Sequence, residues 1–360
     1  MIDYNVIFSF ALAYLVTFAT VPIVRVLAYK MNAVDVPKDK RRMHKKPIPR
    51  WGGAAIFMGF IVSVACFTEI IDIQLIGILM GAFVIEIVGL LDDKYVLKPY
   101  VKLFGQIVAA TIVVASGVRI NIFTNPLPFG DNYINLTYLS IPLTFLWIII
   151  VTNSINLIDG LDGLATSVSA IASLAMVFAC IVLSKFDMAV ILVAVAGACL
   201  GFLPYNSHPA KIFMGDSGAL FLGFILSTLS IQGFFKGYAV MTFVIPVIVM
   251  ALPIFDTSFA ILRRMYKRQG IMSADRGHLH HRLIDMGFSQ RETVTLLSTF
   301  TALLSITAII LTTRGINRAS VLIIVIVAFV ISLRLYFKNK NIEKEYMEDF
   351  NNRREEYEED

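Results

Sequence analysis

The sequence predicts an all-α membrane protein, a polytopic bundle of about eleven transmembrane helices. Of its 360 residues, 57% are hydrophobic and only 16% are charged. Soluble domains carry about 25% charged residues, so this composition is typical of a membrane protein. The apolar residues also form blocks of about 17–25 residues, the length that a helix needs to cross a hydrocarbon core of about 30 Å.

Eleven segments are expected to span the membrane, and glycine or proline marks many of their ends. They cover residues 5–28, 52–68, 74–91, 101–118, 138–152, 164–183, 188–204, 218–235, 238–256, 292–313 and 318–337. The first segment has no basic region before it, and Arg25 and Lys30 follow it instead. We therefore interpret it as a retained helix and not as a cleaved signal.

Lysine and arginine set the expected orientation, because they concentrate in cytoplasmic connections. If the N-terminus lies outside, 26 of the 31 Lys and Arg residues fall on the cytoplasmic side, so we expect an outside N-terminus and a cytoplasmic C-terminus. A single transmembrane catalytic domain is expected over residues 1–337, followed by a charged cytoplasmic tail over residues 338–360. The expected cytoplasmic loops cover residues 30–51, 92–101, 153–163, 205–217 and 257–291.

Carboxylates gather at helix ends on that same face, where intramembrane acids usually mark a functional cavity. Asp92 and Asp93 end the third predicted helix, and the partial negative charge of a helix C-terminus disfavours acids there. The pair therefore needs compensation, which a divalent cation or Lys94, Lys98 and Lys102 could provide. An ordinary charged loop is the alternative reading of this segment.

A second polar stretch follows the fifth predicted helix. Asn153, Asn156 and Asp159 are three residues apart, so they share one face if the helix continues. Asp159 and Asp162 each precede a glycine, which indicates turns. Oxygen side chains of this kind suit a hard cation such as Mg²⁺; a polar helix cap is the alternative.

Asp216 lies between two glycines immediately before the eighth predicted helix. Ser217 is a candidate helix cap, and the backbone amides at such a position favour anions. Asp216 would repel a phosphate unless it holds a metal ion. We therefore expect Asp216 to belong to the same acidic site as the preceding groups.

His278, His280 and His281 lie in a basic loop that also contains Arg263, Arg264, Arg276 and Arg282. We interpret the loop as a set of donors for phosphate or a nucleotide. A zinc site lacks an obvious fourth ligand, and a plain basic surface loop is the remaining alternative. After it, Ser289 and Glu292 form the pattern of a capping box that opens the tenth predicted helix.

The first cytoplasmic loop ends in the segment His44–Gly53, which contains Pro47 and Pro49. Its basic residues could simply anchor the loop on anionic lipid. The stiff proline segment followed by two glycines favours a loop that is folded against the site. Together, acids that hold a divalent cation and cations that meet phosphates favour phosphoryl transfer.

Four motifs carry a resemblance to a known family. GLLDD at 89–93, NSINLIDGLDGLA at 153–165, FMGDSG at 213–218 and GHLHHR at 277–282 occur in the order found in the polyprenyl-phosphate N-acetylhexosamine-1-phosphate transferases. The resemblance covers essentially the whole chain. Because Leu279 interrupts the histidines, the last motif is similar to that of the branch that starts wall teichoic acid, common antigen and O-antigen synthesis, and less similar to the muramoyl-pentapeptide branch.

The resemblance implies a Mg²⁺-dependent glycosyl-1-phosphate transferase, with Mn²⁺ as a substitute cation. It implies UDP-GlcNAc as donor and undecaprenyl phosphate as acceptor, giving undecaprenyl-diphospho-GlcNAc and UMP. This would be the first membrane step of a cell-envelope polysaccharide pathway, in the bacterial plasma membrane with the active site facing the cytoplasm. Membrane lipid is an expected partner and nucleic acid is not; a homodimer would be ordinary for such a bundle, although the sequence does not determine the oligomeric state.

The resemblance also implies residue roles. Asp216 is expected to bind Mg²⁺ with Asn156 as a second ligand, and Asp92 and Asp93 are expected to be catalytic, with Asp93 favoured to deprotonate or position the lipid phosphate. Lys102 would contact phosphate, Phe213 would stack on uracil, and the histidines would touch the pyrophosphate or sugar. The full expected substrate-binding set is Lys45, Arg50, Lys102, Asn153, Asp159, Asp162, Phe213, Arg276, His278, His280 and His281.

Three alternatives stay open at this point. The reaction could be a single displacement, which we favour, or pass through an aspartyl-phosphate. The donor could be another UDP-sugar, such as UDP-MurNAc-pentapeptide or UDP-GalNAc. An ion-coupled transporter also uses intramembrane acids, but here they gather at one face and not at the midplane. Glu86, about two turns inside the third helix, is the exception; it could be a relay, but we expect it to be a polar residue paired within the bundle.

Overall fold

The computed structural model describes residues 4–36, 47–124, 133–235, 240–268, 270 and 277–314, with residues 327 and 330. The chain divides into two units, Met1–Thr313 and Arg314–Asp360, and the first unit contains the candidate site. The expected all-α class is confirmed. Lys45, Arg276 and most of the helix expected at 318–337 lie outside the described residues.

The described helices agree with the apolar blocks over most of the chain. They are α1 (Tyr4–Lys30), α2 (Gly52–Phe67), α3 (Ile73–Tyr95), α4 (Pro99–Ala115), α5 (Ser140–Ile158), α6 (Leu164–Val182), α7 (Phe186–Asn206), α8 (Gly215–Ser230) continued by the π-helix η1 (Ile231–Phe235), α9 (Val240–Val249), α10 (Ala251–Tyr266), α11 (Leu279–Asp285) and α12 (Gln290–Arg314). Two short antiparallel pairs were not expected: β1 (Val34–Asp35) with β2 (Ile48–Pro49), and β3 (Ile122–Thr124) with β4 (Tyr133–Asn135).

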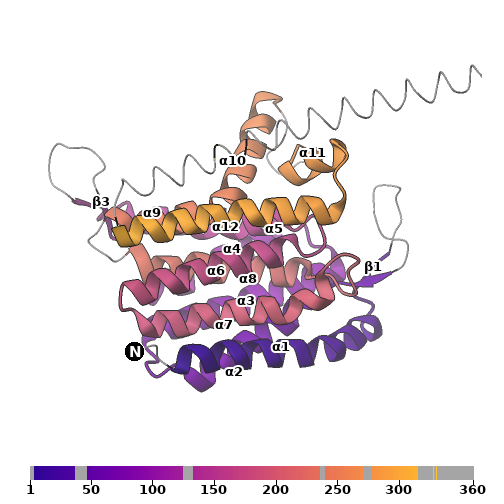
Figure 1. Ribbon diagram of the computed structural model, residues 1–360, viewed down its shortest axis with the longest axis horizontal. Coiled ribbons are helices and arrows are strands. Elements are labelled where there is room, and N and C mark those ends of the chain that lie inside the picture. Colours follow the sequence, from indigo (N-terminus) through magenta and orange to yellow (C-terminus); the bar gives the residue numbers. More distant parts are fainter. Residues whose placement is uncertain are drawn as a thin grey trace, which may run out of the picture. The chain divides into compact units, whose positions relative to one another are not determined.

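The long helices run side by side in stacked layers, and α10 crosses them steeply (Figure 1). Helix α8 is the central element: it packs on α3 and α5, and all its side chains from Ser217 to Ser230 are buried. Helix α1 packs on α7 and α2, and α6 packs on α7. Because α8 is buried along its length, its N-terminus is fixed against the ends of its neighbours, and Asp216 lies at that end.

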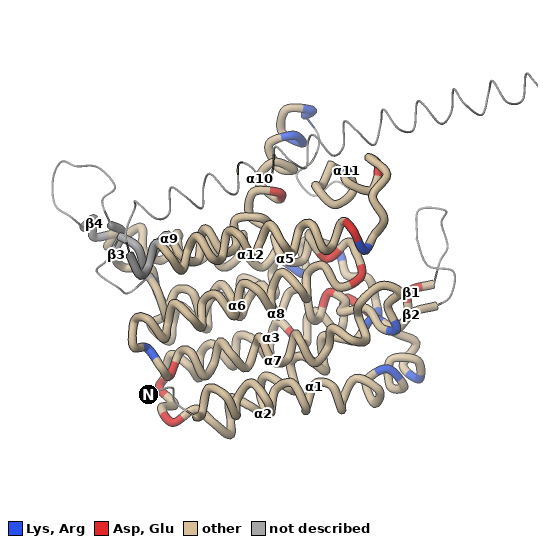
Figure 2. The backbone as a smooth tube through the Cα atoms, in the orientation of Figure 1, with Lys and Arg blue, Asp and Glu red and all other residues tan. Residues whose placement is uncertain are grey.

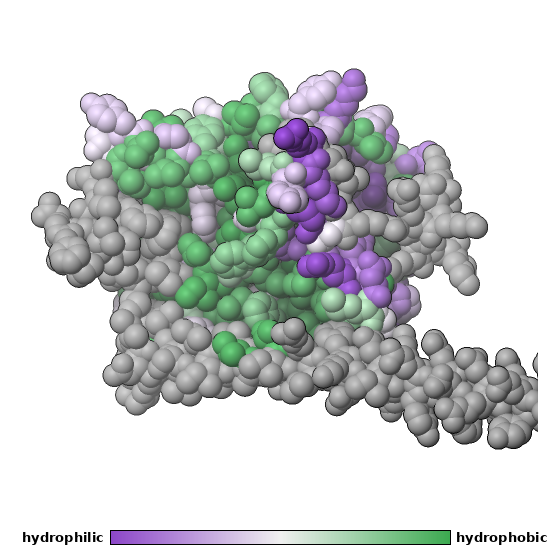
Figure 3. Space-filling model, turned by 90° about the horizontal axis from the view of Figure 1, so that it is seen from above, coloured by the Kyte–Doolittle hydropathy of each residue, from purple (hydrophilic) through white to green (hydrophobic). Residues whose placement is uncertain are grey.

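Within the described residues, seven helices are long and apolar enough to cross a membrane: α1, α3, α5, α6, α7, α8 with η1, and α12. Helices α2 and α4 are apolar but shorter. Charged residues gather near the two ends of the long helices, while the middle of the bundle is nearly free of them (Figure 2). The face that includes α10 is largely hydrophobic over one half, and hydrophilic residues gather in the other (Figure 3).

The single helix expected at 238–256 is two helices, α9 and α10, with a break at Met250. Pro253 explains the break, because its missing N–H cannot bond the carbonyl of Val249 and its ring clashes with that carbonyl. Helix α10 then continues to Tyr266, so residues 257–266, which were expected in a loop, are helical. Likewise α3 extends to Tyr95 and α5 to Ile158, which shortens two other expected loops.

The expected capping box is confirmed at the start of α12. The Ser289 amide donates to Glu292 Oε2 at 2.8 Å, and the Glu292 amide donates to Ser289 Oγ at 3.3 Å. This reciprocal pair satisfies two amides that the first turn leaves unbonded. It fixes where α12 begins, directly after the turn that follows α11.

Candidate active site

Three carboxylates from two helices meet at one end of the bundle. Asp92 and Asp93 lie in the last turn of α3, and Asp216 lies in the first turn of α8. Lys102 of α4 and Asn156 of α5 complete the group, which we call the acidic cluster. Lys102 Nζ donates to Asp92 at 2.9 Å and to Asp216 at 3.2 Å, and Asn156 Nδ2 donates to Asp216.

The two neighbouring acids of α3 have different surroundings. Asp93 accepts the backbone amides of Asp216 at 2.8 Å and Ser217 at 3.1 Å, and the Ser217 hydroxyl at 2.8 Å. It therefore caps α8 from a different helix, where the positive end of the helix dipole stabilises a carboxylate. Ser217, expected to be the cap, donates to it instead. Gly215 permits this approach, since it has φ +73° and a Cβ there would clash with Asp93 and with the carbonyl of Arg50.

Asp92 is compensated by Lys102, as one of the sequence alternatives predicted. Its other oxygen accepts the Leu97 amide at 2.7 Å. Lys94 and Lys98 instead lie over the rings of their neighbours Tyr95 and Tyr100, at 5.1 and 5.8 Å. Lys102 thus bridges two of the three carboxylates, and the third, Asp93, accepts its hydrogen bonds from the start of α8.

A cavity of about 310 Å³ opens beside this cluster. It is lined by Asp35, Arg50, Asn156, Asp159, Gly160, Leu161, Asp162, Asn206, Phe213, Met214, Gly215, Asp216, His281 and Gln290. Five of the expected substrate-binding residues therefore line it, together with both expected metal ligands. Asp216 is the most accessible acid of the cluster, with 27% of its side chain exposed, whereas Asp92 is 4% exposed.

The described parts of the connection between α1 and α2 are folded against this cavity. Strands β1 and β2 pair, the Phe213 amide donates to the Pro49 carbonyl at 2.8 Å, and the Gly52 amide donates to the Phe213 carbonyl at 3.0 Å. Arg50 Nη2 lies 3.7 Å from Asp35 Oδ1. The loop therefore forms one wall of the cavity, next to Asp216.

Asn153 does not line the cavity. It exchanges hydrogen bonds with Gln106 of α4, accepting at 3.2 Å and donating at 2.6 Å, and it also donates to the Ile149 carbonyl. Gln106 lies one helical turn farther into the bundle than Lys102, and Asn153 lies one turn farther into the bundle than Asn156. The amide pair therefore joins α4 to α5 directly beneath the two residues that hold Asp216.

Asp162 lines the cavity but its carboxylate is engaged elsewhere. Its Oδ2 lies 2.7 Å from His208 Nδ1 and accepts the Ala210 amide at 3.1 Å. The carbonyl of His208 in turn accepts two hydrogen bonds from the guanidinium of Arg291, at 2.9 and 3.1 Å. Asp162 thus fixes the turn between α7 and α8 and ties it to the start of α12.

Two groups at the cavity have shifted pKa values. Burial and the negative charge of Asp216 raise the pKa of Asp159 to about 7. Burial and the adjacent His281 lower the pKa of His280 to about 4. His280 is therefore neutral at physiological pH, which is the form that packs against the Asp159–Gly160 turn.

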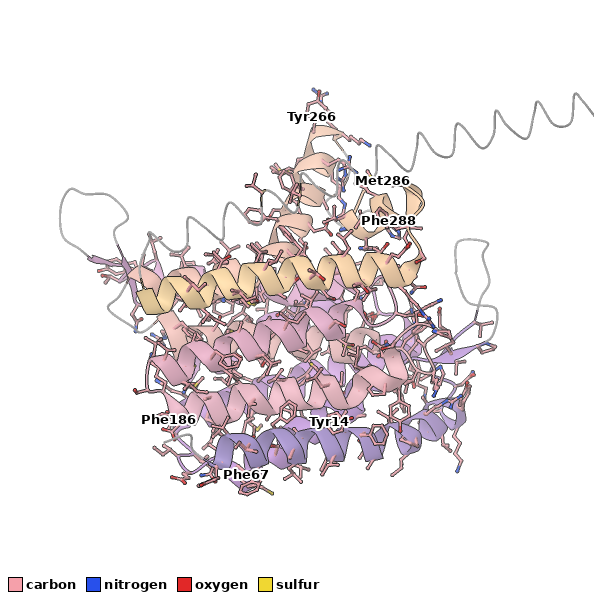
Figure 4. The ribbon with its side chains drawn as sticks, viewed as in Figure 1. Tyr14, Phe67, Phe186, Tyr266, Met286 and Phe288 are labelled. Atoms are coloured by element: carbon pink, nitrogen blue, oxygen red, sulfur yellow. The ribbon has the colours of Figure 1, made fainter. Side chains whose placement is uncertain are left out.

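The histidine segment, residues 277–288 with α11, covers one side of the cavity. His278 and His280 are buried, and His281 reaches the cavity. His278 Nδ1 lies 2.8 Å from Asp256 of α10. Helices α10 and α11 stand on the same side of the bundle, with Tyr266 at the far tip of α10 and Met286 and Phe288 at the end of α11 (Figure 4).

The donor set fits Mg²⁺ better than zinc. No group of three or more His, Cys, Asp or Glu side chains suited to a metal ion occurs among the described residues, so a cation here would also need ligands from amide oxygens, water or substrate. Mg²⁺ is commonly held by one or two carboxylates together with substrate phosphates and water. Asp216 and Asn156 both line the cavity, and the excess of carboxylates over Lys102 would repel phosphates without a divalent cation.

Glu86 differs from expectation. It is buried in α3, 3% exposed, and neither carboxylate oxygen has a hydrogen-bond partner within the described part of the chain. The expected pairing is therefore wrong. Its carboxyl group lies on the same face of α3 as Asp93, two turns deeper in the bundle.

Three partners of the site were missed from the sequence: Gln106, His208 and Asp256. Each pairs with a residue more than twenty positions away in the chain. Asp256 offered the one usable signal, since it is an acid within an apolar run. The amide and the histidine belong to no motif, and only the fold brings them to their partners.

The apolar helix bundle is that of a polytopic membrane protein, and the acidic cavity is its candidate active site. Residues 75–234 match the family described as Glycosyl transferase family 4. The chain is 39% identical over 325 residues to a Bacillus subtilis (strain 168) protein described as a probable undecaprenyl-phosphate N-acetylglucosaminyl 1-phosphate transferase, covering 90% of each chain.

Two further relatives extend the comparison. Identity is 36% over 304 residues with decaprenyl-phosphate N-acetylglucosaminephosphotransferase of Mycobacterium tuberculosis (strain ATCC 25618 / H37Rv), covering 77% of this chain and 75% of that protein. Identity is 29% over 303 residues with phospho-N-acetylmuramoyl-pentapeptide-transferase of Bacillus subtilis (strain 168), covering 81% of this chain and 91% of that protein. The chain belongs to the polyprenyl-phosphate N-acetylhexosamine-1-phosphate transferase superfamily, in the undecaprenyl-phosphate GlcNAc-1-phosphate transferase branch.

Proposed function

We propose that this protein transfers N-acetylglucosamine 1-phosphate from UDP-GlcNAc to undecaprenyl phosphate, giving undecaprenyl-diphospho-GlcNAc and UMP. The observation that carries the proposal is the acidic cluster, in which Lys102 bridges Asp92 and Asp216 at the wall of an open cavity. Relatives named for GlcNAc transfer are 39% and 36% identical, against 29% to 32% for relatives named phospho-N-acetylmuramoyl-pentapeptide-transferase, which supports GlcNAc over the larger donor.

The residues divide into those that meet substrate and those that position them. Bound Mg²⁺, held by Asp216 and Asn156, would polarise the donor phosphate oxygens and offset their charge. Lys102, 23% exposed, binds a phosphate oxygen, and Asp92 holds its ammonium in place. Phe213 and the Gly160–Asp162 turn face the nucleotide, and His281 faces the pyrophosphate or sugar.

The favoured reaction is a single displacement. An oxygen of the lipid phosphate attacks the β-phosphorus of the donor, and the bond to the bridging oxygen breaks to release UMP. A phosphate monoester has its second pKa near 6, so at pH 7 the attacking group is mostly a dianion and needs little help from a base. Asp93 was expected to deprotonate or position the lipid phosphate, and its buried contacts with α8 support positioning over deprotonation. A phosphoenzyme trapped on Asp92 or Asp93 would overturn the single displacement.

The proposed location is the bacterial plasma membrane, with an outside N-terminus and the cavity open to the cytoplasm. This orientation rests on the 26 of 31 Lys and Arg residues that fall on one side when eleven segments span the membrane. The cytoplasm supplies nucleotide sugars, so a cavity on that face meets its donor directly. The lipid product would enter a cell-envelope polysaccharide pathway such as those for teichoic acid or O-antigen.

The test is UMP release by the purified protein with undecaprenyl phosphate and Mg²⁺. UDP-GlcNAc, UDP-GalNAc and UDP-MurNAc-pentapeptide are compared, and Asp216→Asn protein serves as the matched blank. We expect turnover with UDP-GlcNAc, its loss in EDTA, and its return with Mg²⁺ or Mn²⁺. If only one of the other UDP-sugars is turned over, that sugar replaces GlcNAc in the proposal. Ion flux in liposomes without UMP release from any donor would support a transporter instead.

A further inference from the structure

Asp256 lies on α10 outside the cavity, yet it holds the start of the histidine segment. Its Oδ2 lies 2.8 Å from His278 Nδ1, and its Oδ1 accepts the Leu279 amide at 2.8 Å. Both side chains are buried, with 6% of His278 and 10% of Asp256 exposed. One carboxylate therefore fixes both the ring of His278 and the first residue of α11.

The position of His278 is passed on to the cavity through two ring contacts. The rings of His278 and His280 stack with centroids 5.8 Å apart and an interplanar angle of 12°, and the rings of His280 and His281 lie 4.3 Å apart. His280 in turn packs so closely on Gly160 that a Cβ there would lie 2.3 Å from its Nε2. The third ring of the series, His281, lines the cavity.

We propose that Asp256 is a positioning residue that acts through His278 to place His281 at the cavity wall. A carboxylate on Nδ1 selects the tautomer with the proton on Nδ1 and fixes the orientation of the ring. Without it, His278 can rotate and exchange tautomers, and α11 loses an acceptor for its first amide. What His281 then meets, the donor pyrophosphate or sugar, rests on the proposed function.

A purely structural role would have a different signature. If Asp256 only joined α10 to α11, its replacement would lower the fraction of folded protein and leave the kinetic constants of the folded fraction unchanged. If it positions His281, its replacement raises KM for the donor and leaves KM for the lipid acceptor unchanged, because the phosphate of the acceptor meets Lys102. The effect would also disappear in a protein that already lacks the His278 ring.

The experiment compares Asp256→Asn, His278→Asn and the double variant with Asp285→Asn, which removes an exposed carboxylate from the other end of α11. We expect Asp256→Asn to raise KM for UDP-GlcNAc about tenfold, in the range found for residues that orient a functional histidine, with KM for undecaprenyl phosphate unchanged. The double variant should be no worse than His278→Asn alone, and Asp285→Asn should match the unmodified protein.

A second readout needs no activity. In protein labelled with ¹⁵N-histidine, the signal assigned to His278 by its loss in His278→Asn should show a proton fixed on Nδ1, and Asp256→Asn should abolish that preference. Unchanged tautomer signals, a donor KM within twofold of the unmodified protein, or additive effects in the double variant would each overturn the proposal. If UDP-GlcNAc is not a donor at all, the proposed function fails, while the tautomer measurement still decides the role of Asp256.

Discussion

The acidic cluster and the histidine segment face the same cavity but are supported in different ways. The cluster is built on the ends of α3, α4, α5 and α8, helices of 16 to 23 residues that pack on one another. The histidine segment is built on α11, seven residues long, which follows a helix that stands away from the bundle. Isolated helices shorter than about 12–15 residues are marginal in water, so α11 depends on its contacts.

This difference indicates a division of function. Groups that must oppose phosphate charge in a fixed geometry lie where four helices restrain them, because electrostatic stabilisation depends on preorganisation. Groups that recognise the donor lie on a segment held by Asp256 at one end and packed on Gly160 at the other. We expect changes in the cluster to affect kcat most, and changes under the histidine segment to affect donor KM.

The largest effect is expected for Asp216→Asn. The substitution removes the half-buried carboxylate that would hold Mg²⁺, while the backbone amide that donates to Asp93 is unchanged. We expect kcat for UMP release to fall by about 10³-fold, comparable to the loss of a main electrostatic contributor. Thermal unfolding should differ little from that of the unmodified protein. Residual activity within tenfold would remove Asp216 from the centre of the cluster.

Lys102→Met should follow, with kcat lowered by about 10²-fold. The change leaves Asp92 and Asp216 without their shared cation and removes a donor to phosphate. Lys98→Met is the matched control, because this exposed lysine lies one turn earlier over the ring of Tyr100. Equal losses in the two variants would mean that general basic charge matters and that the bridge does not.

The sequence predicted the residue types of the cluster but not the roles within it. Asp92 and Asp93 are adjacent and look equivalent in the sequence, yet one pairs with a lysine and the other caps a distant helix. Apolar blocks predicted most helices because burial in lipid dictates their composition. The break at Met250 followed from Pro253 but was hidden by an unbroken apolar run. Asp256 has no motif, since its partner is fixed only when α10 and α11 pack.

Gly160→Ala tests the other region and should have a smaller effect. The added Cβ would lie 2.3 Å from His280 Nε2 and must displace the histidine segment. We expect KM for UDP-GlcNAc to rise about tenfold, a loss near 1.4 kcal/mol of binding, with kcat changed less than threefold. Gly270→Ala, where a Cβ meets nothing within 4 Å, is the control. A loss of kcat as large as that of Asp216→Asn would contradict the division between the two regions.

Asp159 lines the cavity next to Gly160, and its replacement should have the smallest effect, which we expect in the free energy of unfolding. Its pKa in the folded protein is raised to about 7 by burial and by Asp216, well above the value near 3.9 of an unfolded chain. Between those values the folded state binds more protons than the unfolded state, so this group lowers the free energy of unfolding as pH rises from 4 to 7. Asp159→Asn should therefore be more stable than the unmodified protein at pH 8 and equal to it at pH 4. Melting temperatures are measured for both proteins from pH 4 to pH 8. A difference between them that does not change with pH would show that the charge on Asp159 is compensated within the cavity.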